Sequence, residues 1–145
     1  MFEIEIGKMN YRRCSVMLET GIQGHQELTV TENMTAESME SGCLPVFATP
    51  LMIALAEKTA MLSVAGRLSN GEDTVGSAVN IRHLSPSTIG AKVWCDSELV
   101  EIDRKRLIFH VAVFDEYGMI GEGTHDRFII DREKFMEKAR SRQDS

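Results

Sequence analysis

The stretch ATPLMIALAEKTAMLSVAG, Ala48 to Gly66, decides the fold. Thr49 before Pro50 is typical of an N-cap residue followed by proline at the first helical position, and Gly66 is a common helix stop. Between them nearly every turn is apolar or small on all sides, which predicts a buried helix. With Glu57 inside it, the helix is too short and too charged to cross a membrane. We therefore expect the rest of the chain to wrap around it.

The composition of the chain indicates an ordinary globular protein. Its 145 residues are enough for one domain with a real core. A net charge of −6 argues against nucleic acid as a partner. The three cysteines are an odd number without a C-x-x-C pair, which favours a reduced, cytoplasmic protein. We expect neither a signal peptide nor a membrane partner, and we interpret residues 1–16 as a loosely attached extension of a single domain at 17–145.

Strand patterns lie on both sides of the helix. Alternation of apolar and polar residues predicts one strand before it, at 25–32, and four after it, at 75–83, 91–102, 107–115 and 119–130. The last two connections, 103–106 and 116–118, are short enough for hairpins, so the sheet should be antiparallel. We expect the polar segment 33–42 to act as a lid, and 132–140 to form a short amphipathic helix.

This order of elements predicts an α+β architecture, a curved antiparallel β-sheet wrapped around one long central helix. Such an arrangement is called a hotdog fold. One helix cannot cover both edges of a sheet, and exposed edges favour pairing with a second copy. We therefore expect a homodimer.

Glu57 and His83 are the first candidates for chemistry. A carboxylate buried in an apolar helix would have a raised pKa, suited to a general base for hydrolysis. The alternative is that Glu57 lies on a solvated stripe, paired with Lys58 or Arg67. His83 ends a strand on which Val75, Ser77, Val79 and Ile81 share its face. It is either a hydrogen-bonded core residue or, beside a buried glutamate, a base with a fixed tautomer.

Thr49 has two interpretations. As an N-cap it would stabilise the helix by about 1 kcal/mol. Alternatively its hydroxyl, with the free N–H groups of Leu51 and Met52, could bind a carbonyl oxygen that gains charge, position water or act as a nucleophile. Glu57 lies eight residues further on, about 12 Å along the axis. The two cannot meet within one helix, so they have separate roles or the site combines two subunits.

A strand with two glycines, Gly121 and Gly123, leads to Arg127. Glycines in a strand predict a bulge, packing against the helix or clearance for a ligand. Arg127 is either a surface residue or the partner of an anionic group. The four histidines have no ligand-like spacing with the cysteines, and no P-loop or dinucleotide fingerprint is present. We expect neither a metal nor another cofactor.

Three segments carry a resemblance to a known family: VFATPLMIALAE (46–57), VGSAVNIRHLSPSTIG (75–90) and GEGTHDRFII (121–130). They resemble the hotdog-fold thioesterases of the fluoroacetyl-CoA thioesterase-like group, with a match from about residue 21 to 138. The resemblance implies acyl-CoA hydrolysis to a free acid and CoA, in a homodimer with sites at the subunit interface. It implies a catalytic set of Thr49, Glu57 and His83, with Gly76 lining the acyl pocket and Arg127 matching the arginine of the family.

We therefore predict a cytoplasmic thioesterase that acts on a short or medium acyl-CoA. One alternative is a non-catalytic acyl-CoA or small-ligand binding protein of the same fold. A purely structural dimerisation domain is another, in which Thr49, Glu57 and His83 would share no location. A hydratase of this fold would need an Asp-to-His spacing that we do not find in the sequence.

Overall fold

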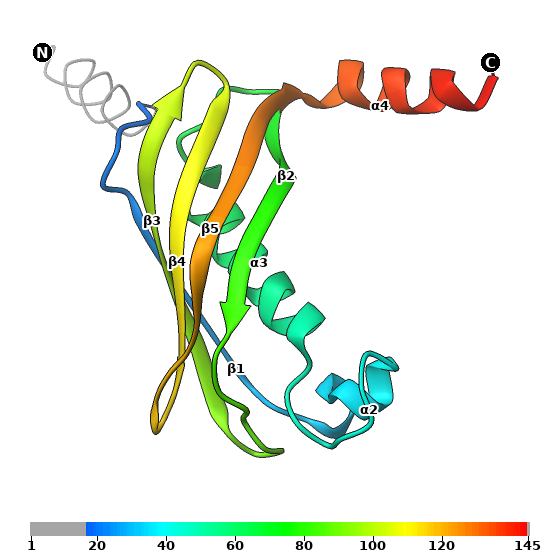
Figure 1. The fold of residues 1–145 in the computed structure, drawn as a ribbon. Helices are drawn as coiled ribbons and strands as arrows, with labels where there is room; N and C mark the ends of the chain where they lie inside the picture. The colour runs from blue at the N-terminus through cyan, green and yellow to red at the C-terminus, as the bar shows by residue number, and fades with distance from the viewer. Residues whose placement is uncertain (1–16, 145) are drawn as a thin grey trace, which may run out of the picture.

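A single antiparallel sheet packed against one long helix forms the body of the protein (Figure 1). The computed structural model describes residues 17–144, so the predicted extension at 1–16 lies outside the described residues. The strands have the order β1-β3-β4-β5-β2 and the bounds β1 (Gln23–Thr29), β2 (Glu72–His83), β3 (Lys92–Asp103), β4 (Arg106–Asp115) and β5 (Gly118–Asp131). The central helix is α3 (Thr49–Ala65). The predicted α+β hotdog architecture is confirmed.

Short helices lie before and after this body. η1 (Glu32–Met34) and α2 (Ala36–Met39) occupy the segment that the sequence assigns to a lid. α4 (Arg132–Ser141) and η2 (Arg142–Asp144) follow the last strand, and α4 extends away from the sheet in Figure 1. None of the helices in residues 17–144 is long and apolar enough to span a membrane.

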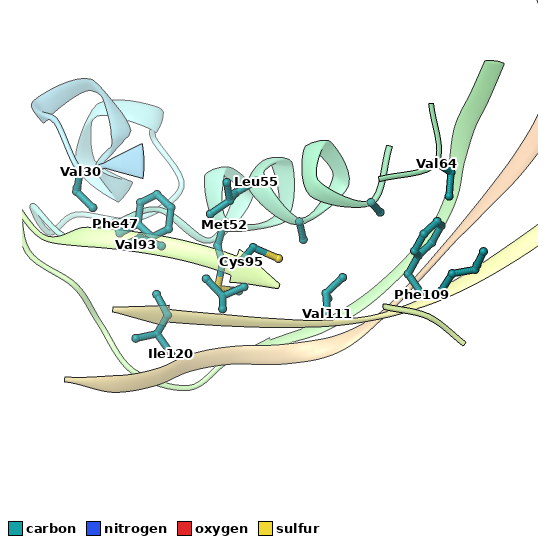
Figure 2. Close-up of a cluster of buried hydrophobic side chains, with 14 of the residues drawn as sticks. Val30, Phe47, Met52, Leu55, Val64, Val93, Cys95, Phe109, Val111 and Ile120 are labelled. Carbon is teal, nitrogen blue, oxygen red and sulfur yellow. The ribbon is translucent and has the colours of Figure 1, made fainter. Parts of the chain in front are cut away.

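The core lies between one face of α3 and the inner face of the sheet (Figure 2). From α3 it takes Met52, Leu55, Ala56, Ala60 and Val64, which pack on apolar side chains of the sheet such as Val93, Phe109 and Val111. The expectation of a helix buried on all sides is wrong for this single chain, since Leu62 is 44% exposed. One sheet covers one side of a helix, so the other side of α3 remains open.

The start of α3 differs from the prediction. Ala48 is the N-cap residue, Thr49 is already helical, and no side chain caps the helix. Thr49 is therefore the first helical residue and not the N-cap, and its hydroxyl contacts a distant side chain, as described below. The helix stops at Gly66 as expected, where φ is −77°, a right-handed conformation.

Strand β2 contains a bulge that the alternation pattern does not reveal. Its register against β5 shifts between Gly76 and Ala78, so Ser77 is an extra residue. Gly76 faces α3, and Val75 therefore faces away from it, beside Phe128 of β5. The prediction that Val75 shares a face with His83 is wrong, because one inserted residue reverses the alternation.

The two glycines of β5 allow close approach of neighbouring groups. A β-carbon at Gly123 would overlap the carbonyl oxygen of Asn80 and lie 2.6 Å from the Cα of Ile81. A β-carbon at Gly121 would lie 2.6 Å from the sulfur of Met52. Packing against β2 and against the helix thus explains both glycines.

We expect Gly123→Ala to lower the free energy of unfolding by about 1–3 kcal/mol or more, because the backbone of β2 cannot yield as a side chain would. Urea unfolding measures this difference. Gly66→Ala is the matched control, since a β-carbon there meets no atom within 4 Å. Equal stability of the two variants would show that β2 can shift away from β5.

Candidate active site

The first half of the site is formed where α3 begins and β2 ends. The hydroxyl oxygen of Thr49 lies 2.8 Å from Nδ1 of His83, although the two residues are 34 positions apart. The ring of Phe47 meets the imidazole edge-on, with 6.5 Å between ring centroids. Nε2 of His83 is buried and has no hydrogen-bond partner within residues 17–144. A buried nitrogen without a partner is costly unless a ligand or water uses it.

Burial also sets the charge of His83. Loss of solvent lowers the pKa of this histidine below its ordinary value, and a backbone hydrogen bond with Ser85 opposes the shift only in part. The imidazole is therefore neutral at neutral pH. A neutral imidazole beside a hydroxyl can accept a proton, as a general base must.

A hollow of about 310 Å³ opens beside the Thr49–His83 pair. Its lining includes Ala36, Ser41, Phe47, Thr49, His83 and Leu84. The segment predicted as a lid thus borders the hollow, and it contributes small side chains without an aromatic ring.

The helix start offers fewer oxyanion donors than the sequence suggested. The N–H groups of Leu51 and Met52 both donate to the carbonyl oxygen of Ala48, at 3.0 and 3.1 Å. They are not free, so this part of the prediction is wrong. The hydroxyl of Thr49 remains as a donor at the hollow, assisted by the positive end of the helix dipole.

The second half of the site surrounds Glu57. A β-carbon at Gly76 would lie 2.8 Å from Oε2 of Glu57, 3.2 Å from Cε1 of His125 and 3.4 Å from Nη1 of Arg127. Gly76 thus makes room for a carboxylate, an imidazole and a guanidinium on the inner face. Glu57 is half-buried. Its environment is therefore intermediate between the two that the sequence predicts, a buried position and a solvated stripe.

No partner holds the Glu57 carboxylate in the described chain. Arg67, one of the predicted partners, instead donates to the carbonyl oxygen of Met17 at 2.8 Å. Lys58, the other predicted partner, forms no ion pair among residues 17–144. The Glu57 carboxylate is therefore available to a ligand or to another protein chain.

Arg127 is buried, not a surface residue, and is only 6% exposed. Its Nε donates to the hydroxyl of Thr74 at 2.8 Å, its Nη2 to the carbonyl oxygen of Thr74 at 2.9 Å, and its Nη1 lies 3.1 Å from Nε2 of His125. His125 was not among the predicted site residues. The signal was available, because residues two apart in a strand share a face.

The two halves do not meet in one chain. Thr49 contacts His83, whereas Glu57 lies beside Gly76, seven residues before His83 in β2. The predicted pairing of Glu57 with His83 is therefore absent from residues 17–144. No group of three or more histidine, cysteine or acidic side chains in this range could hold a metal ion.

Comparison with known proteins assigns the family. A model of the fluoroacetyl-CoA-specific thioesterase family matches residues 30–133. The fluoroacetyl-CoA thioesterase of Streptantibioticus cattleyicolor is 36% identical over 107 residues, which cover 73% of this chain and 77% of that protein. The chain belongs to the fluoroacetyl-CoA thioesterase family. This thioesterase is thus a thioester hydrolase, as its sequence predicts.

Solved structures agree with this assignment. A fluoroacetyl-CoA thioesterase structure is 29% identical with a TM-score of 0.80, and the match covers 86% of the present thioesterase and 97% of that chain. A Thermus thermophilus protein described as a thioesterase superfamily member is 27% identical with a TM-score of 0.82, covering 88% and 95%. The predicted fold and enzyme class are confirmed.

Proposed function

We propose that this thioesterase hydrolyses a short or medium acyl-CoA to the free acid and CoA, with Thr49, Glu57 and His83 as its catalytic set. The contact between Thr49 and a neutral His83 at the edge of the hollow carries the proposal. A hollow of about 310 Å³ suits a small acyl group. A related fluoroacetyl-CoA thioesterase has been solved with acetyl-CoA. The free thiols of Cys43 and Cys95 support a cytoplasmic location.

The working unit of this proposal is a homodimer joined along β2. The sheet order places β2 at an edge, and its central residues 76–80 are exposed in the single chain. Edge strands have unpaired backbone N–H and C=O groups, which a second copy can satisfy in an antiparallel, two-fold arrangement. The uncovered side of α3 adds apolar surface, such as Leu62, that a partner would bury.

Two-fold pairing of β2 would also bring the two half-sites together. Without the extra residue Ser77, Gly76 and His83 each lie three positions from Asn80, so a two-fold axis at Asn80 sets Gly76 opposite the partner's His83. Glu57, which lies beside Gly76, then faces the partner's Thr49 and His83. Each dimer would contain two such sites, with Gly76 and Arg127 next to the acyl group.

The chemistry follows from these positions. His83 and Glu57 remove a proton from water as its oxygen attacks the thioester carbonyl, or they sustain a transient acyl group on Thr49. The hydroxyl of Thr49 and the N-terminus of α3 stabilise the negative oxygen when water attacks. The C–S bond then breaks, the CoA thiolate takes the proton that the base removed from water, and the free acid leaves. All groups in these steps belong to the protein, the substrate and water.

Release of the CoA thiol from a panel of acyl-CoA thioesters tests the proposed function. We expect turnover of acetyl-, butyryl- and hexanoyl-CoA and much weaker turnover of palmitoyl-CoA, since the hollow cannot enclose a long chain. Calorimetry on the same panel measures binding. Tight binding of an acyl-CoA without any free thiol would contradict hydrolysis and favour the alternative, a non-catalytic acyl-CoA binding protein.

A further inference from the structure

We propose that His125 is a positioning residue: its neutral imidazole accepts a hydrogen bond from Arg127 and so fixes the guanidinium beside Gly76 and Glu57. This inference rests on the proposed function of that site. It concerns a fully buried histidine that the catalytic set does not include.

The contacts of His125 define one protonation state. Nδ1 lies 2.8 Å from the carbonyl oxygen of Ala78, which can only accept, so Nδ1 carries the hydrogen. Nε2 lies 3.1 Å from Nη1 of Arg127, which can only donate, so Nε2 presents its lone pair. Both contacts are satisfied only by the neutral Nδ1–H tautomer.

Packing keeps the ring and the guanidinium in place. The imidazole of His125 is stacked on Phe109, with 6.4 Å between centroids and 29° between planes. Thr74 holds Arg127 through Nε and Nη2, and His125 holds it through Nη1. A guanidinium has five N–H groups, so one on Nη1 and one on Nη2 remain without a partner among the described residues. These groups are available to a bound acyl group.

The Glu57 carboxylate lies near Arg127 but does not pair with it. Arg127 and Glu57 both lie against the space above Gly76, yet they form no ion pair within residues 17–144. A guanidinium free to rotate could reach toward the carboxylate and neutralise it. By holding Nη1, His125 keeps the cation and the carboxylate as two separate groups facing the substrate.

The surroundings of His125 keep it neutral. Burial lowers the pKa of His125 most, a hydrogen bond to Ala78 raises it, and the Arg127 charge lowers it. Glu57 from α3 and Asp126 from β5 raise the pKa, while β4 contributes the Phe109 ring. If Nε2 of His125 were protonated, its N–H group would face an N–H group of Arg127, and the hydrogen bond between them would be lost. Acid would therefore release Arg127 from its position.

Two amide variants separate positioning from structural support. In His125→Gln the amide can replace Nε2 as the acceptor for Arg127, whereas in His125→Asn it can replace Nδ1 as the donor to Ala78. We expect His125→Asn to lower kcat/KM by about 10- to 100-fold, the range found when the hydrogen-bond partner of a metal-ligating side chain is removed. We expect His125→Gln to retain most of the wild-type kcat/KM, although the carbonyl of Ala78 loses its partner and the melting temperature falls.

A merely structural role predicts the opposite order, with His125→Asn tolerated and His125→Gln impaired. Kinetics are compared at a temperature at which calorimetry shows both variants to be folded. The reverse order, or equal losses of kcat/KM in both variants, would overturn the positioning role.

Nitrogen-15 NMR of the imidazole provides a readout that needs no substrate. We expect the resonances that disappear in His125→Gln to report a neutral Nδ1–H tautomer at pH 7. An Nε2–H tautomer in an active wild-type enzyme would overturn this inference alone. The expected tautomer in a protein that hydrolyses no acyl-CoA would overturn the proposed function alone.

Discussion

Glu57→Gln and His83→Ala are each expected to lower kcat for acyl-CoA hydrolysis by about 10²- to 10⁴-fold, the range for loss of a general base. Neither change should unfold the protein. Glu57 has no hydrogen-bond partner in the described chain, and glutamine has nearly the same shape. His83 binds the exposed side chain of Thr49 and the backbone of Ser85, and its Nε2 has no partner within residues 17–144. Thiol release measures kcat, and calorimetry verifies the fold.

Lys58→Gln is the matched control for Glu57→Gln. Lys58 follows Glu57 in α3, is exposed, and has no ion pair within residues 17–144. We expect its loss to leave kcat and KM unchanged. Wild-type turnover by Glu57→Gln or by His83→Ala would remove that residue from the catalytic set.

Mixed dimers of the two inactive variants are expected to regain activity. If each site combines Glu57 of one subunit with His83 of the other, a dimer of one Glu57→Gln chain and one His83→Ala chain contains one intact site and one doubly altered site. Such a dimer should show about half of the wild-type turnover, because two-fold symmetry gives two equivalent sites. Coexpression of the two variants with different affinity tags allows the mixed dimer to be purified.

The parent variants, purified with the same two tags, serve as controls and should remain inactive. If each site lay within one chain, both sites of the mixed dimer would carry one defect, and no activity would return. An inactive mixed dimer would therefore overturn the shared site while leaving the thioesterase assignment intact.

The sequence predicts most of the fold because strand and helix periods are local and strong. The apolar run of α3 and the alternation of β3 and β4 locate these elements within about two residues. The start of α3 was mispredicted because N-cap preference is also local. His83, 34 positions away, binds the Thr49 hydroxyl that would otherwise cap the helix.

The site was less accessible to sequence analysis. Its named residues came from a family resemblance, whereas the contact of Arg127 with His125 depends on a tautomer that only the surrounding packing selects. The open side of α3 was likewise hidden, since an apolar residue such as Leu62 looks the same whether its own chain or a partner covers it.

The extra residue at Ser77 has a consequence for how this site can be varied. Gly76 and His83 are an odd number of positions apart, so in a regular strand their side chains would leave opposite surfaces of the sheet. The bulge corrects this parity and turns both toward α3. Between these two positions a substitution preserves the parity, whereas a single deletion would place one of them on the outside.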